Sequence, residues 1–406
     1  MENEMKYVVV LGDGMADYPV KELGNKTPLQ AASKPNMDFL AAHGEMGLVH
    51  TIPEGLAPGS DIANLSVLGY DPEKYYTGRS PLEAISMGIP MESGDVTFRT
   101  NLVSLSYEKD YADRIMLDHS SDEISTEEAS ILIEEVNKHF RNDFLAFYPG
   151  VSYRHCLLWK NGSLNFDLTP PHDILEKKIA PYLPKGKDGD LLLQMMSESC
   201  EFLSNHPVNK ERIRRGKKPA NSIWIWGEGR KPILPSFFDL HGRKGSVISA
   251  VDLVKGLGIS AGMKSVDVAN ATGTLETNYE GKAEAALKEL EKGKDFVYIH
   301  IEAPDECGHR GEAENKVRAI ELIDARVLTV LLKGLDKYED YRLMVLPDHP
   351  TPLSIRTHTS DPVPYVIYQK SRKRLSGPLS YDEFSAKETG IVRTSGQCLM
   401  NRFLHS

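Results

Sequence analysis

The residues best suited to chemistry stand in turns that follow apolar, strand-like segments. They are Asp13 in GDG, Asp305 and His309 in APDECGH, Asp348 and His349 in PDHPTP, and His358 in the loop IRTHTSDPVP. In open α/β sheets, ligands bind beyond the carboxyl ends of the strands, so we expect these groups to converge. The proline and glycine of APDECGH predict a turn, not a helix, for that segment.

Carboxylates and imidazoles without thiolates are typical ligands of Mn²⁺ or Zn²⁺, whereas Mg²⁺ is less natural with imidazole. Six such ligands are too many for one tetrahedral ion and suit two. Two metal ions about 3.5–4 Å apart can clamp the attacking and leaving oxygens of an in-line phosphoryl displacement. Taken singly, each turn also fits an ordinary turn or cap.

A nucleophile for such a site is found in GLAPGSDIANLSVLGYDP. Gly59 permits a sharp turn, and the following segment predicts a helix that begins at Ser60. A helix N-terminus offers free N–H groups and a dipole that favours phosphate, and a metal ion would lower the pKa of the hydroxyl. The alternative is that Ser60 is only a helix cap.

The segments around these turns predict an α/β core. Strands are expected at 6–12, 47–51, 245–250, 295–302, 341–349 and 363–369, and helices at 27–44, 251–258 and 312–335. Alternation of this kind indicates a mostly parallel sheet flanked by helices.

The middle of the chain has a different pattern and predicts a smaller inserted α+β domain. Alternating strands are expected at 96–105 and 151–160, and helices at 125–140, where Ser125 and Glu128 match a capping box, and at 188–205. We therefore place the core at 1–92 and 228–406 and the insertion at 93–227.

Composition narrows the class of protein. The 406 residues carry a formal net charge of −10, which argues against nucleic acid and anionic membranes as partners. Four cysteines without a CxxC pair are expected to be free thiols, and no apolar stretch reaches the length of a membrane span. We predict a cytoplasmic protein, a monomer or small homo-oligomer.

The motifs GDGM, APGSDIANLSVLGYDP, APDECGH, PDH and RTH together resemble the alkaline phosphatase superfamily. Within it, the chain resembles the cofactor-independent (2,3-bisphosphoglycerate-independent) phosphoglycerate mutases of the archaeal type over nearly its whole length. The resemblance implies an alkaline-phosphatase-like core and an inserted domain that closes over the substrate. It also implies interconversion of 3-phosphoglycerate and 2-phosphoglycerate, a step of glycolysis, through a phosphoserine.

The same resemblance implies two divalent metal ions, Mn²⁺ first with Zn²⁺ or Co²⁺ as alternatives, and no 2,3-bisphosphoglycerate. It assigns Asp305, His309 and His358 to one ion. It assigns Asp13, Asp348, His349 and the nucleophile Ser60 to the other.

A small phosphorylated carboxylate as substrate calls for basic groups in the insertion. The candidates are Arg154, Arg99, Arg79, Arg214 and Lys218. Each is also compatible with an ordinary surface role, and the basic run at 209–222 with a solvated face.

Trp226 stands before a glycine where the archaeal mutases have an arginine, and IEAPDECGHRGE is similar to bacterial proteins proposed as homoserine kinases. The alternative functions are therefore intermolecular phosphoryl transfer at the same site, homoserine kinase-like, and metal binding without turnover.

Overall fold

A computed structural model of the chain describes residues 5–374 and 377–405. These residues form two compact units: 1–76 with 234–406, called the core unit here, and 77–233, called the inserted unit. The sequence predicts limits at 93 and 228 for the insertion. The first limit lies earlier because α5 (Ser80–Ser86) packs on strands β3 and β9 of the inserted unit.

The core unit is built on an eight-stranded sheet in the order β11-β10-β12-β1-β13-β14-β2-β15. Its strands are β1 (Lys6–Gly12), β2 (Glu45–Val49), β10 (Gly245–Ile248), β11 (Lys264–Val266), β12 (Phe296–Ile301), β13 (Tyr341–Leu346), β14 (Val363–Gln369) and β15 (Val392–Arg393). Strand β14 runs antiparallel to both of its neighbours, and the other pairs are parallel. The sheet is therefore mostly parallel, as the sequence predicts.

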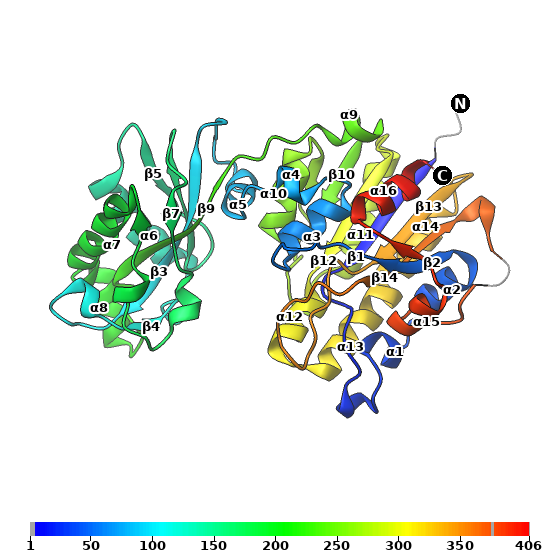
Figure 1. The fold of residues 1–406 in the computed structure, drawn as a ribbon, viewed down its shortest axis with the longest axis horizontal. Coiled ribbons are helices and arrows are strands. Elements are labelled where there is room, and N and C mark those ends of the chain that lie inside the picture. The colour runs from blue at the N-terminus through cyan, green and yellow to red at the C-terminus, as the bar shows by residue number, and fades with distance from the viewer. Residues whose placement is uncertain (1–4, 375–376, 406) are drawn as a thin grey trace. The chain divides into compact units, whose positions relative to one another are not determined.

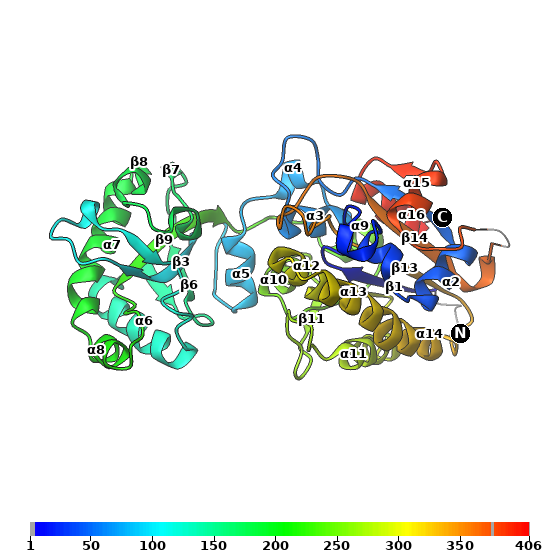
Figure 2. The same cartoon turned by 90° about the horizontal axis from the view of Figure 1, so that it is seen from below.

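Helices cover both faces of this sheet (Figures 1 and 2). They are α1 (Pro28–Ala31), α2 (Pro35–His43), α3 (Ser60–Val67), α4 (Pro72–Tyr75), α9 (Phe237–His241), α10 (Asp252–Ser260), α11 (Tyr279–Glu291), α12 (Ala303–Arg310), α13 (Ala313–Leu322), the π-helical η5 (Ile323–Leu328), α14 (Thr329–Leu335), α15 (Glu383–Glu388) and α16 (Gly396–His405). Two short 3₁₀ turns, η1 (Lys21–Leu23) and η6 (Lys370–Arg372), complete the unit.

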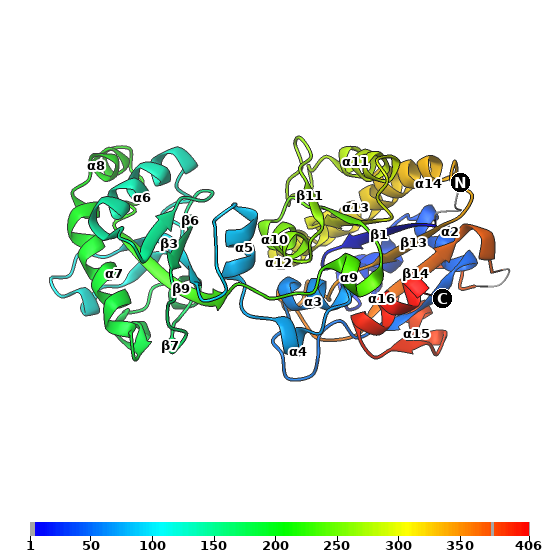
Figure 3. The ribbon, with the colours of Figure 1, turned by 90° about the horizontal axis from the view of Figure 1, so that it is seen from above.

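Alternate residues of β1 explain the two covered faces. Val8 and Val10 pack into the cluster formed with α2, α11, α13 and α14. Tyr7 points the other way, and its ring meets Phe403 of α16 edge-on at 5.6 Å. Figure 3 shows α3, α9 and α16 on this second face. A strand buried on both faces is what the continuous apolar run at the start of the chain predicts.

The inserted unit is an α+β fold around an antiparallel sheet in the order β4-β3-β6-β5, with β9 paired to β3. Its strands are β3 (Val96–Leu105), β4 (Met116–Asp118), β5 (Leu145–Tyr148), β6 (Arg154–Trp159) and β9 (Ser222–Arg230), with the small pair β7 (Phe166–Asp167) and β8 (Lys185–Gly186). The helices are α5, α6 (Thr126–Phe140), α7 (Gly189–Ser204) and α8 (Pro207–Arg214), with 3₁₀ turns η2 (Tyr111–Asp113), η3 (Pro171–Ile174) and η4 (Ala180–Tyr182). The predicted fold class, an α/β core with a smaller inserted α+β domain, is confirmed.

Three local predictions differ from the structure. The single helix expected at 27–44 is two helices, because Pro35 begins a new one. APDECGH is helical throughout in α12, because Pro304 lies in the first turn and needs no N–H there. Ser125 caps α6 by accepting from the Glu128 N–H, but the Glu128 carboxylate pairs with Arg212 and Arg215, so the reciprocal half of the capping box is not made.

Within the described residues, no helix has the length and apolar character needed to cross a lipid bilayer.

Candidate active site

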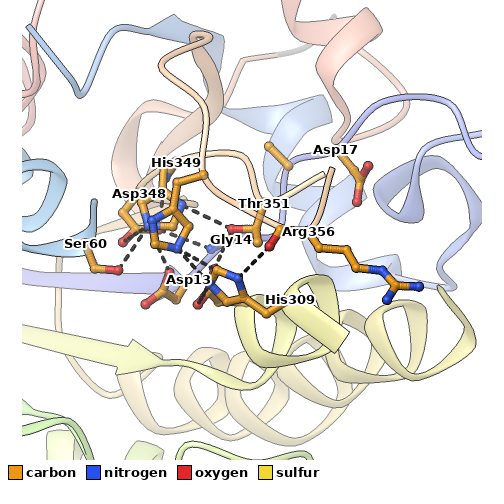
Figure 4. Close-up of polar contacts among 12 residues, drawn as sticks. Asp13, Gly14, Asp17, Ser60, His309, Asp348, His349, Thr351 and Arg356 are labelled. Carbon is orange, nitrogen blue, oxygen red and sulfur yellow. Dashed lines mark hydrogen bonds and ion pairs between the residues drawn. The ribbon is translucent and has the colours of Figure 1, made fainter. Parts of the chain in front are cut away.

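The sheet order places three of the predicted turns side by side. Strands β12, β1 and β13 are neighbours and run parallel, so their carboxyl ends share one edge of the sheet. Asp13 follows β1, Asp348 follows β13, and Asp305 lies in α12 directly after β12. Figure 4 shows side chains from these three segments turned toward one another.

The six predicted ligands form two groups, within each of which the ligand atoms lie within 4.8 Å of one another. The first group is Asp305, His309 and His358, and the second is Asp13, Asp348 and His349. All six are residues that the sequence predicts as ligands, so the fold brings every predicted carboxylate and imidazole ligand into one of the two groups.

In the first group, helix α12 places Asp305 and His309 one turn apart on the same face. Nε2 of His309 lies 3.2 Å from Oδ2 of Asp305, and Nε2 of His358 lies 3.4 Å from Oδ1. The two Nε2 atoms are 2.9 Å apart. Nδ1 of His309 lies 3.0 Å from the carbonyl oxygen of Arg356, which fixes the ring with Nε2 facing the carboxylate.

In the second group, Oδ1 of Asp348 accepts the backbone N–H groups of Gly14 and His349, at 3.1 and 2.9 Å. Nε2 of His349 lies 3.5 Å from Oδ1 of Asp13 and 3.4 Å from Oδ2 of Asp348. All three side chains are almost completely buried. Two carboxylates and an imidazole are thus held in contact without access to bulk water.

The electrostatics of the site indicate a need for positive charge. Burial, followed by repulsion from Asp348 and Asp305, raises the pKa of Asp13 well above its usual value. Its Oδ1 is buried and accepts no hydrogen bond from any described residue. An orphaned buried carboxylate oxygen among other carboxylates fits a cation, and the oxygen and imidazole donor set fits a divalent one.

His309 of the first group and His349 of the second group differ in charge. Hydrogen bonding to Asp305 raises the pKa of His309 to about 9, whereas burial lowers the pKa of His349. Burial opposes ionisation of Asp305, but hydrogen bonds from His309 and His358 hold its pKa well below the usual range. In the protein without cations, His309 therefore supplies positive charge that a bound ion would replace.

Ser60 lies where the predicted nucleophile is needed. It is the first residue of α3, and its Oγ is 3.0 Å from Nε2 of His349. Gly59 in the N-cap position makes no side-chain cap, and the Ile62 N–H donates to Oδ1 of Asp61 at 3.0 Å. Among the described residues, the N–H groups of Ser60 and Asp61 therefore stay available near the hydroxyl. The hydroxyl thus lies beside the second group, at the positive end of a helix dipole.

Sequence reasoning missed Asn64, which ties the nucleophile to the ligands. Its Nδ2 donates to the carbonyl oxygen of Ser60 at 2.8 Å and to Oδ2 of Asp348 at 2.9 Å. Its Oδ1 accepts from the buried hydroxyl of Tyr298 at 2.7 Å. The spacing of one helical turn after Ser60 is the signal that could have identified it.

Two further residues orient the carboxylates. Nε2 of His300 lies 2.9 Å from Oδ2 of Asp13, and Nδ1 of His300 lies 3.2 Å from Ser249 Oγ. Thr351 Oγ1 donates to Oδ1 of Asp305 at 2.5 Å. The sequence pattern around His300 predicts only that this residue lies in a strand. It gives no sign that the imidazole contacts Asp13.

Gly14 is required at the centre of the site. Its φ is +62°, and a Cβ there would lie 2.5 Å from Thr351 Oγ1 and 2.7 Å from Oδ1 of Asp305. The left-handed backbone and the lack of space both exclude a side chain. The glycine lets the turn after β1 approach α12 and place Asp13 next to Asp305.

A buried ion pair supports the segment that carries Thr351. Nζ of Lys316 lies 2.7 Å from Oδ2 of Asp17 and donates to the Thr351 carbonyl oxygen at 2.8 Å. Both charged side chains are fully buried, and the Asp17 carboxylate also accepts the Leu353 N–H. The pair therefore fixes the loop after His349 to helix α13.

In the inserted unit, three of the predicted substrate-binding residues gather; we call them the arginine group. Arg79 and Arg99 each place Nε 3.0 Å from a different oxygen of Glu83, and Arg99 lies over the ring of Trp226 at 4.3 Å. Burial, followed by repulsion from Arg79 and Arg154, lowers the pKa of Arg99. Arg154 is exposed and lies over the ring of Tyr153 at 4.6 Å.

The other two basic candidates lie at the surface with acidic partners. Arg214 donates twice to Glu211 at 2.7 Å. Lys218 lies 3.0 Å from Asp118 and 3.6 Å from Asp122. Their substrate contacts stay predictions, and these partners supply an ordinary surface role for both.

The core unit holds two carboxylate–imidazole groups beside a serine at a helix N-terminus. Metal-dependent enzymes that transfer or hydrolyse phosphate esters use the same kinds of group. Residues 41–209 match the family described as 2,3-bisphosphoglycerate-independent phosphoglycerate mutase.

Relatives extend this match over the whole chain. A probable 2,3-bisphosphoglycerate-independent phosphoglycerate mutase of Geobacter sulfurreducens is 50% identical and covers 98% of this chain and 100% of its own. The enzyme so named from Methanosarcina barkeri is 51% identical and covers 96% and 98%. The solved cofactor-independent phosphoglycerate mutase of Thermoplasma acidophilum is 27% identical, with a TM-score of 0.66 and 98% of both chains covered.

The chain therefore belongs to the family of 2,3-bisphosphoglycerate-independent phosphoglycerate mutases, which are isomerases. The alternative prediction of a homoserine kinase-like transferase is not favoured, because the relatives are named as mutases.

Proposed function

We propose that the protein interconverts 3-phosphoglycerate and 2-phosphoglycerate through a phosphoserine at Ser60. The observation that carries the proposal is the position of Ser60 Oγ, 3.0 Å from His349 Nε2 at the N-terminus of α3. In this reaction the hydroxyl attacks the phosphorus of the substrate in line, and the phosphoryl group later returns to the other hydroxyl of the glycerate.

Two divalent cations are proposed at this site, with Mn²⁺ first and Zn²⁺ or Co²⁺ as alternatives. Asp305, His309 and His358 would hold one, and Asp13, Asp348, His349 and Ser60 would hold the other. When bound, such ions neutralise charge on phosphoryl oxygens and lower the pKa of a serine hydroxyl.

The chain's own residues would prepare the nucleophile. The hydrogen bonds of Asn64 to the Ser60 carbonyl and to Asp348 keep the first turn of α3 against the carboxylates. The N–H groups of Ser60 and Asp61 in that turn would stabilise a phosphate on Ser60. His300 and Thr351 would hold Asp13 and Asp305 in one orientation throughout turnover.

The arginine group of the inserted unit is proposed to bind the substrate carboxylate. Arg154 is the most accessible of the three and is held over an aromatic ring, so its planar donors remain available. Retention of the glycerate after the first transfer is what separates a mutase from a phosphatase, because a released glycerate would leave the phosphoserine to water.

The test is Ser60→Ala, with Ser66→Ala as a matched control on the same helix. Ser66 Oγ accepts from the Gly396 N–H and is not among the residues of the site. We expect S60A to lose all interconversion of the two phosphoglycerates while its thermal midpoint and metal content stay close to wild type, and S66A to remain active. Phosphopeptide mapping of quenched enzyme should find phosphate on residue 60. Turnover by S60A would remove Ser60 from the mechanism.

A further inference from the structure

Three consecutive residues of the inserted unit have a strained backbone. Ser121, Asp122 and Glu123 have φ of +52°, +53° and +48°, and none of them is glycine. The left-handed region is disfavoured for L-residues, because the Cβ approaches the following carbonyl oxygen, and runs of such residues are unusual. Strain of this kind persists only where the surroundings hold it, and it is concentrated at functional sites.

Arg212 is a buried holder of this turn, beside the Lys218 N–H, which donates to Oδ2 of Asp122 at 2.7 Å. Its side chain is 3% exposed, and its Nη2 donates to the carbonyl oxygen of Ser121. The same guanidinium pairs with Glu128 in the first turn of α6 and donates through Nε to the Lys218 carbonyl oxygen at 3.1 Å. One planar cation thus fixes the turn, the start of α6 and the chain before β9.

The turn begins two residues after His119, after Ser120, and restrains the position of His119. Asp118, before it, accepts the Ser120 N–H at 2.8 Å and the Asp122 N–H at 3.2 Å, which closes the turn around His119. The His119 carbonyl oxygen accepts from Asn101 Nδ2 at 3.0 Å. The backbone on both sides of His119 is therefore fixed.

The imidazole of His119 lies among the residues that neighbour the arginine group. Its ring meets that of Tyr153 edge-on at 5.6 Å, and Arg154 lies over the same tyrosine ring. Another left-handed residue, Ser152 with φ of +55°, precedes Tyr153 and donates from its N–H to Thr126 Oγ1 at 3.0 Å. Strained backbone thus adjoins the segments that carry both His119 and Arg154.

We propose that Arg212 is a positioning residue that holds the left-handed turn 121–123 so that His119 faces the arginine group. This proposal rests on the proposed function, because the arginine group is the part of the inserted unit assigned to the substrate. Arg212 itself is buried and does not touch the substrate. The basic run at 209–222 thus serves the site through this arginine, which the sequence analysis did not single out.

The first experiment compares Arg212→Lys with Arg141→Lys as the matched control in the same unit. A lysine keeps the charge but cannot bridge the Ser121 carbonyl and Glu128 together. We expect R212K to raise KM for 3-phosphoglycerate about tenfold with kcat little changed, since one charge-assisted hydrogen bond of the turn is lost. Arg141 is exposed at the C-terminal end of α6 and belongs neither to the turn 121–123 nor to the arginine group, so R141K should behave as wild type. Wild-type KM in folded R212K would overturn the proposal.

A rescue separates this role from simple anchoring of α8. Glu123 is exposed, so Glu123→Gly and Glu123→Ala remove the same carboxylate, but only glycine relieves the strain. We expect E123G to restore most of the lost affinity in the R212K protein, and E123A to restore none. Equal behaviour of the two double variants would mean that Arg212 does not act by holding the strained turn.

Two readouts do not depend on turnover. In the otherwise wild-type protein, E123G should melt above E123A, the reverse of the usual order of glycine and alanine. The opposite order would overturn the strain argument even if R212K failed to fold. In ¹³C-histidine NMR spectra, R212K should shift the His119 ring signals and R141K should not. Absence of mutase activity in the wild-type chain would refute the proposed function, whereas these two readouts would still decide the role of Arg212.

Discussion

Residue types in the sequence predict both the two ligand groups of the core unit with Ser60, called the core site, and the arginine group of the inserted unit. The two sites differ in what positions their side chains. The core ligands follow three neighbouring parallel strands, so sheet topology alone brings Asp13, Asp305 and Asp348 together. Arg79, Arg99 and Arg154 come from a helix start and two strands, and side-chain partners fix them. A site built on strand ends is therefore rigid by construction, whereas the arginine group depends on its neighbours.

The largest effect is expected from removing a core ligand. Asp305→Asn should abolish turnover, because the carboxylate that both His309 and His358 contact is lost. Metal analysis after dialysis should show fewer bound ions than in wild type, with circular dichroism unchanged. Full activity and full metal content in D305N would show that the first group is not a ligand set.

A smaller loss is expected at Asn64, which orients the core site. Asn64→Ala should lower kcat about 10–100-fold, as loss of an orienting partner does at metal centres. Asn64→Asp is the control, because it keeps the acceptor for Tyr298 but replaces the donor to Asp348 by a repelling charge. N64D should be at least as impaired as N64A; activity of N64D near wild type would contradict the assigned hydrogen bond.

The arginine group should show its effect in KM. Arg99→Gln is expected to raise KM about 10–100-fold through loss of a charge-assisted contact to the substrate carboxylate. Arg214→Gln is the matched control and should leave KM unchanged. The measurement is the KM for 3-phosphoglycerate in steady-state kinetics. Equal KM values for the two variants would contradict a substrate-binding role for the arginine group that the surface arginine lacks.

The sequence predicts residues at strand ends and helix starts better than residues whose roles depend on side-chain partners. Asp13, Asp348 and Ser60 were found because a strand end or helix start is visible as a change of pattern. Asn64 and His300 were missed because their roles depend on partners distant in the chain. The segment APDECGH predicts a turn because proline and glycine destabilise the interior of a helix. Pro304 instead lies in the first turn, and Gly308 lies inside the helix, where a Cβ would come 2.6 Å from the Thr351 carbonyl oxygen.

The smallest effect concerns stability away from both sites. Burial opposes ionisation of Glu45, but hydrogen bonds from Arg402 and Arg393 lower its pKa to about 2. A depressed pKa stabilises the fold above the ordinary glutamate value near 4.5, and that stability is lost as the pH falls through about 2. Glu45→Gln should lower the free energy of unfolding at pH 7 by about 1.5–3 kcal/mol. Denaturant melts at pH 7 and pH 3 should show the gap narrowing; a constant gap would contradict the ion-pair account.

The buried pair of Lys316 and Asp17 has a consequence for engineering the protein toward heat. Both charged side chains are fully buried, so the ion pair carries a desolvation penalty. This penalty falls as the temperature rises, because the hydration of ions becomes less favourable on warming. Replacing either partner alone would strand its neighbour and loosen the loop that holds Thr351. A thermostable variant is therefore better sought on the exterior of the protein, with this interior contact left as it is.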